Sequence, residues 1–187
     1  MKNFKLLLGV LLISTTLFAQ HSEEELENNS HNEGTHTVSH GKNMIAIDYG
    51  IDHIKEGVKH GDAIDEEGHW VSSIGIDYFR GISEKWGVGV KFDIQLGHYI
   101  IPHKENLERE NAFIALAVGS YKILPKWGVF AGAGVEFEKN ENLGVIRVGT
   151  EYLFHLKHGW AIPVGFFWDI KEGYDVYAFT VGIAKHF

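Results

Sequence analysis

Five histidines lie in two polar stretches of the sequence, with carboxylates close to them. The histidines are His53, His60, His69, His98 and His103, and the neighbouring carboxylates are Asp52, Asp62, Glu66 and Glu67. Imidazole and carboxylate groups are ligands that suit zinc, copper or nickel. No two of the five are spaced like a ligand pair on a helix, so simple solvation of loop histidines is the alternative. We therefore expect no obligatory cofactor and keep a divalent transition metal as an open alternative.

A serine pair offers a nucleophile for hydrolysis. Ser72 and Ser73 follow closely after His69 and Trp70. Acyl transfer by serine needs a histidine as its base and a carboxylate that orients the histidine. The chain has no His-x-Ser pattern, and several of its polar stretches contain no serine. We therefore expect a protein that is not an enzyme, with a lipid-modifying hydrolase as the remaining alternative.

A third set of charged residues is interleaved with apolar ones at a spacing of two. The set is Asp48, Asp77, Lys91, Asp93, Glu136, Arg147, Glu151 and Asp169. Successive side chains of a strand point to opposite faces, so these charges share one face of their strands. On that face Arg147 and Lys91 can meet carboxylates of neighbouring strands, which predicts a closed polar network rather than a catalytic site.

From Asn43 to the end of the chain, apolar residues repeatedly alternate with small or polar ones at a period of two, which predicts eight strands. Their apolar faces are marked within residues 45–51, 74–78, 86–96, 114–118, 127–137, 146–154, 160–170 and 177–187. Short turns at 81–85, 124–126 and 157–159 alternate with looser polar connections at 55–69, 97–109, 138–142 and 171–174. Short turns on one side and longer loops on the other are typical of an outer-membrane β-barrel whose turns lie in the periplasm. Both termini are then periplasmic.

The first 42 residues differ from the rest of the chain. Residues 1–20 combine two early lysines with an apolar run and Ala19, which is typical of a secretory signal peptide. Residues 21–42 contain almost no large apolar side chain, which predicts a disordered periplasmic leader rich in histidine and glutamate. The barrel domain is then 43–187. The formal net charge of −8 argues against nucleic acid as a partner, and without cysteine there is no disulfide framework.

Three features predict that the apolar faces point outward to lipid. Glycines such as Gly132, Gly134 and Gly182 fall on the opposite face, as suits the narrow interior of a small barrel. The charged set shares that face, and a lysine or arginine at mid-membrane on the lipid side costs roughly 2–4 kcal/mol. Aromatic residues form two girdles, with Trp86, Trp127, Trp160 and Phe187 at one rim and Trp70, Phe137, Trp168 and Tyr177 toward the other. Two separate belts do not suit a soluble barrel around a ligand.

The last strand ends in Phe187, which Ile183, Val181 and Phe179 precede on the same face. From residue 43 onward the chain resembles the small outer-membrane barrels of the OmpA/OmpX type. The resemblance implies an all-β, eight-stranded, antiparallel, up-and-down transmembrane barrel. It also implies that the barrel-assembly machinery reads the terminal strand, although Lys185 stands where an aromatic residue is more usual. Outer-membrane lipid and lipopolysaccharide are the partners implied, and we expect a monomer.

Barrels of this kind include inert stabilisers, adhesins and lipid-modifying enzymes, so the fold does not fix the function. We expect an integral outer-membrane protein of a Gram-negative cell, with a lumen filled by side chains and a structural or interaction role at the envelope. Metal binding or sensing through the histidine-rich leader and the outer loops is the first alternative. Modification of outer-leaflet lipid is the second.

Overall fold

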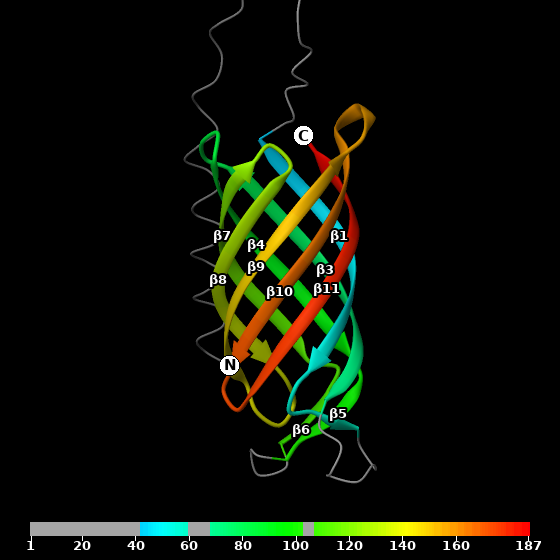
Figure 1. Ribbon diagram of the computed structural model, residues 1–187. Coiled ribbons are helices and arrows are strands. Elements are labelled where there is room, and N and C mark those ends of the chain that lie inside the picture. The colour runs from blue at the N-terminus through cyan, green and yellow to red at the C-terminus, as the bar shows by residue number, and fades with distance from the viewer. Residues whose placement is uncertain (1–41, 60–67, 103–106) are drawn as a thin grey trace, which may run out of the picture. The chain divides into compact units, whose positions relative to one another are not determined.

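Eight long strands close into an antiparallel barrel. The computed structural model describes residues 42–59, 68–102 and 107–187. The barrel strands are β1 (Asn43–Ile54), β3 (His69–Gly81), β4 (Trp86–Leu96), β7 (Phe113–Leu124), β8 (Trp127–Phe137), β9 (Leu143–His155), β10 (Trp160–Lys171) and β11 (Tyr174–His186). They follow one another around the ring in chain order, and β11 pairs with β1 to close it (Figure 1). The prediction of an eight-stranded, antiparallel, up-and-down barrel is confirmed.

Some predicted segments lie outside the described residues. These are the signal peptide at 1–20, the leader at 21–42 except its last residue, and the two histidines His60 and His103. What the sequence predicts for them stays a prediction. Within the described ranges, no helix is long and apolar enough to cross a membrane.

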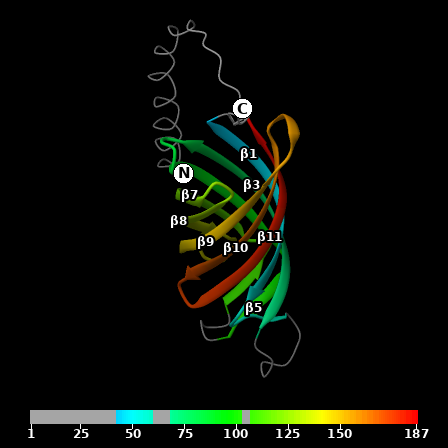
Figure 2. The same cartoon turned by 45° about the horizontal axis from the view of Figure 1, so that its top comes forward.

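A second, small sheet lies at one end of the barrel, which we call the loop end. It consists of β2 (Val58–Lys59), β5 (His98–Ile101) and β6 (Leu107–Glu110), paired in the order β2-β5-β6 (Figures 1 and 2). The sequence predicts polar connections at 55–69 and 97–109, and the short strands of this sheet, which the sequence analysis did not predict, lie largely within them. Tyr99 and Ile101 are fully buried against the loop-end residues Ile54, Val71 and Val176, because these apolar side chains need cover where the barrel strands end.

The opposite end, which we call the turn end, carries the turns at 81–85, 124–126 and 157–159. The first and last barrel residues meet there through two backbone hydrogen bonds. The Asn43 N–H donates to the Phe187 carbonyl at 3.0 Å, and the Phe187 N–H donates to the Asn43 carbonyl at 2.9 Å. Gly159, at φ +74°, supplies the left-handed conformation that the tight turn between β9 and β10 needs.

Apolar side chains cover the outside of the barrel, as the alternation predicts. On β1, Ile45, Ile47 and Tyr49 are about half exposed (45%, 56% and 48%), whereas Ala46 and Asp48 between them face inward and are buried. The same alternation is present on β8, where Trp127, Val129, Ala131, Ala133, Val135 and Phe137 are the exposed set. A belt of exposed aliphatic and aromatic groups on a closed barrel is what contact with lipid requires.

Strand β7 departs from the predicted orientation. Ile114, Leu116 and Val118 were expected on the lipid-facing side, but they are buried in the lumen, so this prediction is wrong. Their neighbours on β8 explain the reversal, because Leu116 lies opposite Gly134 and Val118 opposite Gly132. The glycines leave lumen volume beside β7, and large aliphatic side chains fill it.

One glycine shows why small residues collect on the inner face. A Cβ atom at Gly75 would lie 2.7 Å from Asp48 Oδ1 and 2.8 Å from Asp93 Oδ1. Both distances are shorter than real Cβ contacts allow. Gly75 on β3 therefore makes room in the lumen for two ionisable side chains from β1 and β4.

Candidate functional site

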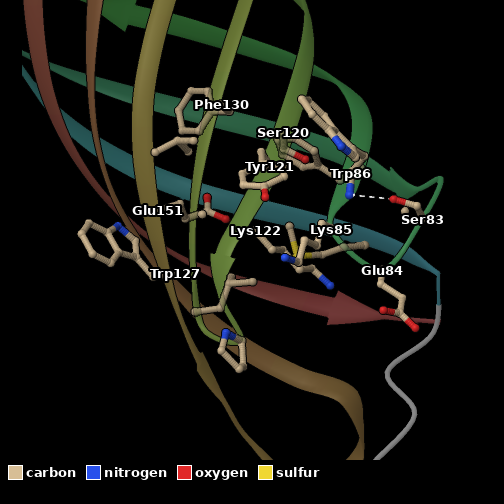
Figure 3. A pocket seen from close by; sticks show the side chains of 18 of the residues that line it. Ser83, Glu84, Lys85, Trp86, Ser120, Tyr121, Lys122, Trp127, Phe130 and Glu151 are labelled. Carbon is tan, nitrogen blue, oxygen red and sulfur yellow. Dashed lines mark hydrogen bonds between the residues drawn. The ribbon is translucent and has the colours of Figure 1, made fainter.

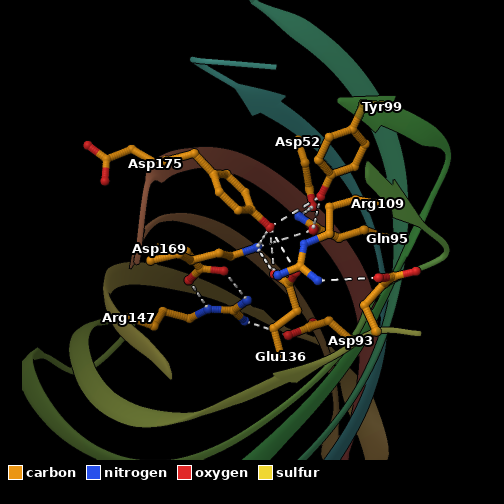
Figure 4. A network of polar contacts seen from close by, with 12 residues as sticks. Asp52, Asp93, Gln95, Tyr99, Arg109, Glu136, Arg147, Asp169 and Asp175 are labelled. Atoms are coloured by element: carbon orange, nitrogen blue, oxygen red, sulfur yellow. Dashed lines mark hydrogen bonds and ion pairs between the residues drawn. The ribbon is translucent and has the colours of Figure 1, made fainter. Parts of the chain in front are cut away.

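Ionisable side chains fill the lumen in three clusters along its length. The turn-side cluster contains Asp48, Asp77, Lys91 and Glu151, and the middle cluster contains Asp93, Arg147 and Asp169. The loop-side cluster contains Asp52, Ser73, Gln95, Tyr99, Arg109, Glu136, Lys171 and Tyr174. Figure 4 shows the loop-side and middle clusters together.

In the turn-side cluster, one lysine is held between a carboxylate and two aromatic rings. Lys91 on β4 forms an ion pair with Asp77, its direct cross-strand neighbour on β3. The lysine Nζ lies 5.4 Å from the centre of the Phe79 ring and 5.1 Å from that of Phe130. Ring faces attract a desolvated cation, so the rings and the carboxylate stabilise the same buried charge.

In the middle cluster, one arginine joins opposite walls of the barrel. The Arg147 guanidinium on β9 donates to Asp169 on β10 through Nε (2.5 Å) and Nη2 (2.8 Å). Its Nη1 donates to Asp93 on β4 at 2.6 Å, although β4 and β9 are separated by two strands. The guanidinium carbon also lies 3.7 Å from the centre of the Phe167 ring. This planar, bidentate pairing fixes the geometry across the lumen as well as the charge.

In the loop-side cluster, Glu136 on β8 contacts polar groups of three other elements. The Lys171 Nζ on β10 lies 2.5 Å from one carboxylate oxygen, and the Arg109 Nε on β6 lies 3.0 Å from the other. The Tyr174 hydroxyl at the start of β11 donates to the same carboxylate at 2.8 Å. Glu136 has no exposed side-chain area, so the Tyr174 hydroxyl and the charges of Lys171 and Arg109 compensate for the water that its carboxylate has lost.

A second carboxylate in that cluster anchors the other wall. Asp52 on β1 accepts from the Ser73 hydroxyl and from the Gln95 amide, each at 2.8 Å. The Gln95 carbonyl accepts in turn from Lys171 Nζ at 3.2 Å. The Asp52 and Glu136 networks therefore meet at Lys171, which links β1, β4, β8 and β10.

The small loop-end sheet contributes directly to this network. Arg109 of β6 has no exposed side-chain area and donates to the Glu141 carbonyl as well as to Glu138 Oε2, at 3.4 Å. The Tyr99 hydroxyl of β5 donates to Gln95 at 3.2 Å. Burial, with a smaller contribution from Tyr174, raises the pKa of Tyr99 well above its usual range. The sheet therefore closes the loop end with a neutral phenol and a paired arginine.

The predicted lumen residues all have inward-facing positions. Asp48, Asp77, Lys91, Asp93, Glu136, Arg147 and Asp169 are buried, and Glu151 is half-buried. The expected girdle residues lie on the outer face. Trp86, Trp127, Trp160 and Phe187 are at the turn end, and Trp70, Phe137, Trp168 and Tyr177 are toward the loop end. Trp168 and Tyr177 stack at 5.9 Å between ring centres, as neighbours on β10 and β11.

The predicted metal ligands are not brought together as a site by the described residues. His53 packs on Trp70 at 4.5 Å between ring centres, and His69 lies 6.4 Å from the Tyr99 ring. The Nε2 of His98 lies 2.5 Å from Glu108 Oε1. In the described part of the chain, no group of three or more histidine and carboxylate side chains is placed to hold a metal ion. The prediction of a site that also uses His60 and His103 stays a prediction.

The two serines face opposite sides of β3. The Ser73 hydroxyl points inward and donates to Asp52, whereas the Ser72 hydroxyl points outward and lies 2.7 Å from the Tyr49 hydroxyl. Among the described contacts, neither hydroxyl has a histidine partner, so the geometry does not assemble a serine–histidine pair.

Sequence reasoning missed seven members of the network, one of them Ser73, which was considered only as a nucleophile. Gln95 lies at an inward-facing position within the predicted strand 86–96. Asp52 and Lys171 each continue the inward alternation one residue beyond the predicted apolar faces, so extending those strands would have found them. Tyr174 lies at the start of β11, next to the two-residue turn that was taken for a loop. Tyr99 and Arg109 come from the small sheet, where four-residue strands give too little alternation to recognise.

Solved outer-membrane barrels share this architecture, although their sequences have diverged. Ail, the attachment invasion locus protein of Yersinia pestis, aligns with a TM-score of 0.53 and 12% identity over 79% of this chain and 99% of its own. Ail in complex with the heparin analogue sucrose octasulfate aligns at 0.52 and 15% identity over the same shares. Neisserial surface protein A aligns at 0.50 and 8% identity, over 79% of this chain and 98% of its own. No protein-family model and no curated protein matches the chain. The chain therefore has the fold of a small eight-stranded outer-membrane β-barrel.

Proposed function

We propose that this chain is an integral outer-membrane barrel whose lumen is closed by its own side chains, with a structural or interaction role at the cell envelope. The cross-lumen pairing of Arg147 with Asp93 and Asp169 is the observation that carries the proposal. A conducting pore needs a continuous water-filled path, whereas here ion pairs join strands that are not neighbours.

The outer surface supports insertion into a bilayer. Exposed aliphatic residues such as Ile47, Ile76 and Ile146 lie between the two aromatic girdles. Aromatic belts that bracket an apolar band are the usual surface of a transmembrane barrel. We propose the outer membrane as the location, with the turn end and both termini in the periplasm, because short turns commonly lie on that side.

The terminal strand supports a role in assembly. On β11, Phe179, Val181, Ile183 and Phe187 are all more than half exposed on the lipid-facing side. We propose that the barrel-assembly machinery recognises this strand. We also propose that the protein is a monomer, which outer-membrane lipid and lipopolysaccharide surround.

The loop end offers the surface for an interaction role. Its exposed charged residues in the described loops are mainly acidic and include Glu108, Glu110, Glu141 and Glu172. Exposed cations among them include Lys55, which pairs with Glu56, and Lys139. Such a surface favours a cationic partner over a polysulfated sugar such as the heparin analogue bound by Ail.

Conductance in planar lipid bilayers tests the closed lumen. The mature chain, refolded and inserted, is expected to add no steady current above that of the bare bilayer. Lys139→Gln, which removes an exposed charge, is the control for refolding and insertion, and it is also expected to add no steady current. A large, steady wild-type conductance would contradict the proposal.

The metal alternative has a separate test. Zinc can be titrated calorimetrically into the mature chain and into a variant with His53→Ala and His98→Ala. The alternative is retained only if the wild type binds zinc at micromolar concentration and the double variant loses that heat. Equal heats in both proteins exclude these two histidines as ligands.

A further inference from the structure

A cavity of about 540 Å3 opens at the turn end of the barrel, on the far side of the lumen network from the loop-end sheet. Phe130 and Glu151 line its inner part, and the turns at 81–85 and 124–126 line its mouth (Figure 3). Phe79 is also among the lining residues. The lumen network does not use most of these residues, so the cavity is a feature of its own.

Four lysines gather around this mouth, and we call them the lysine ring. They are Lys42, Lys85, Lys122 and Lys126. Lys85 and Lys126 are exposed turn residues that directly precede β4 and β8. Lys122 lies near the end of β7, opposite Gly128 on β8, and Lys42 directly precedes β1.

Backbone hydrogen bonds place members of the ring beside one another. The Lys122 N–H donates to the Lys85 carbonyl at 2.8 Å, so Lys122 on β7 lies beside Lys85, the turn residue directly before β4. Like charges directly opposite each other on a sheet repel and destabilise it. None of the four lysines forms an ion pair with any residue in the described ranges.

The cavity's own carboxylates do not neutralise the ring. Glu84 is exposed in the turn between β3 and β4. Glu151 lies deeper, where it interacts electrostatically with Lys91 of the turn-side cluster. Arg80 adds a fifth cation to the lining. The mouth is therefore an anion-binding environment whose counter-charge is not supplied by the described residues.

The lining also selects for an amphiphile. Trp86 and Trp127 belong to the lipid-facing girdle and line the same cavity. Met44, Phe79 and Phe130 give the interior an apolar wall. A lipid whose chains pack against the outward tryptophans can place its headgroup over the rim and onto the lysine ring. Free phosphate would make no use of these apolar surfaces.

We propose that the turn-end cavity binds the phosphodiester headgroup of an anionic phospholipid, with Lys85 and Lys122 as its principal partners. This inference rests on the proposed function, because it places the turn end at a membrane surface. Ammonium groups donate up to three charge-assisted hydrogen bonds to phosphate oxygens, and bound phosphate relieves the repulsion between the two lysines.

Native mass spectrometry of the mature chain in zwitterionic detergent provides the test. Phosphatidylglycerol and phosphatidylcholine with identical acyl chains are titrated into wild type, a Lys85→Gln/Lys122→Gln variant and a Lys157→Gln/Lys139→Gln control. The control removes two positive charges, as the Lys85/Lys122 variant does. Lys157 lies at the turn end but outside the cavity lining, and Lys139 lies at the loop end. Wild type and control are expected to retain one phosphatidylglycerol in preference to phosphatidylcholine, and the Lys85/Lys122 variant to bind it about tenfold more weakly.

Three results would overturn the inference. They are equal retention of both lipids by wild type, an equal loss in the control variant, and full displacement of phosphatidylglycerol by millimolar inorganic phosphate, which would mark a simple phosphate site. Circular dichroism of each variant checks that the strands are intact. If the double variant does not fold, Lys122→Gln and Lys122→Arg replace it, and only the arginine is expected to retain the lipid. Failure of the wild type to insert into vesicles would instead count against the proposed function.

Discussion

Replacing Arg147 with alanine measures how far the lumen network stabilises the barrel. The guanidinium is 1% exposed and makes three charge-assisted hydrogen bonds of 2.5 to 2.8 Å, two to Asp169 and one to Asp93. Removing it leaves two buried carboxylates without a base. Loss of one partner from a buried ion pair costs about 3–5 kcal/mol. The contact with the Phe167 ring is lost as well, so we expect the upper half of that range.

Urea unfolding in lipid vesicles, followed by tryptophan fluorescence, provides the measurement. Arg147→Ala is expected to lower the free energy of unfolding by about 4 kcal/mol. Arg147→Met combined with Asp93→Asn and Asp169→Asn is expected to recover most of the loss, because no unpaired charge stays buried. The exposed control Lys139→Ala is expected to change stability by less than about 0.5 kcal/mol. A loss below about 1 kcal/mol for Arg147→Ala would refute the idea that this pairing closes a water-free lumen.

Three further predictions follow from other parts of the barrel. On β7, Leu116→Ala is expected to cost about 2–5 kcal/mol of unfolding free energy, whereas Ala117→Leu costs less than about 1 kcal/mol; the reverse order would contradict the observed orientation. In the loop-end sheet, burial raises the pKa of Tyr99, so the folded state resists its ionisation and stability falls as pH rises above 10. Above pH 10, the free energy of unfolding of Tyr99→Phe is expected to decrease with pH less steeply than that of the wild type, by up to about 1.4 kcal/mol per pH unit. Equal slopes for the two proteins would argue against a buried, neutral Tyr99. Gly75→Val is expected to lower the free energy of unfolding by about 1–3 kcal/mol, because its Cβ would force the carboxylates of Asp48 and Asp93 to shift, and an unchanged urea midpoint would contradict it.

The sequence was sufficient for the barrel because a strand that separates lipid from a packed lumen has to alternate. Ile45, Ile47 and Tyr49 on β1 are separated by Ala46 and Asp48, and no other arrangement keeps the charge away from lipid. Charged residues with this parity also indicated a polar lumen. Two pairs, Lys91 with Asp77 and Arg147 with Asp169, join neighbouring strands, as expected for bases surrounded by carboxylates.

What the sequence could not supply depends on contacts between distant strands. On β7 both parities are apolar or small, so alternation alone did not show that Leu116 faces Gly134 in the lumen. The link from Arg147 to Asp93 crosses the barrel and depends on its diameter and stagger, which no local pattern reports. Arg109 reaches Glu136 only because the small loop-end sheet folds over the lumen.

The central claim is that one face of each strand is exposed to lipid while the other carries charged groups into the lumen. Site-directed spin labelling tests this claim most directly. The chain has no native cysteine, so single cysteines can be introduced along β1 from Ile45 to Ile51 and labelled in vesicles. The account predicts high accessibility to dissolved oxygen, which partitions into lipid, at positions 45, 47, 49 and 51, and low accessibility at 46, 48 and 50. Accessibility without a period of two, or with the two sets exchanged, would contradict it.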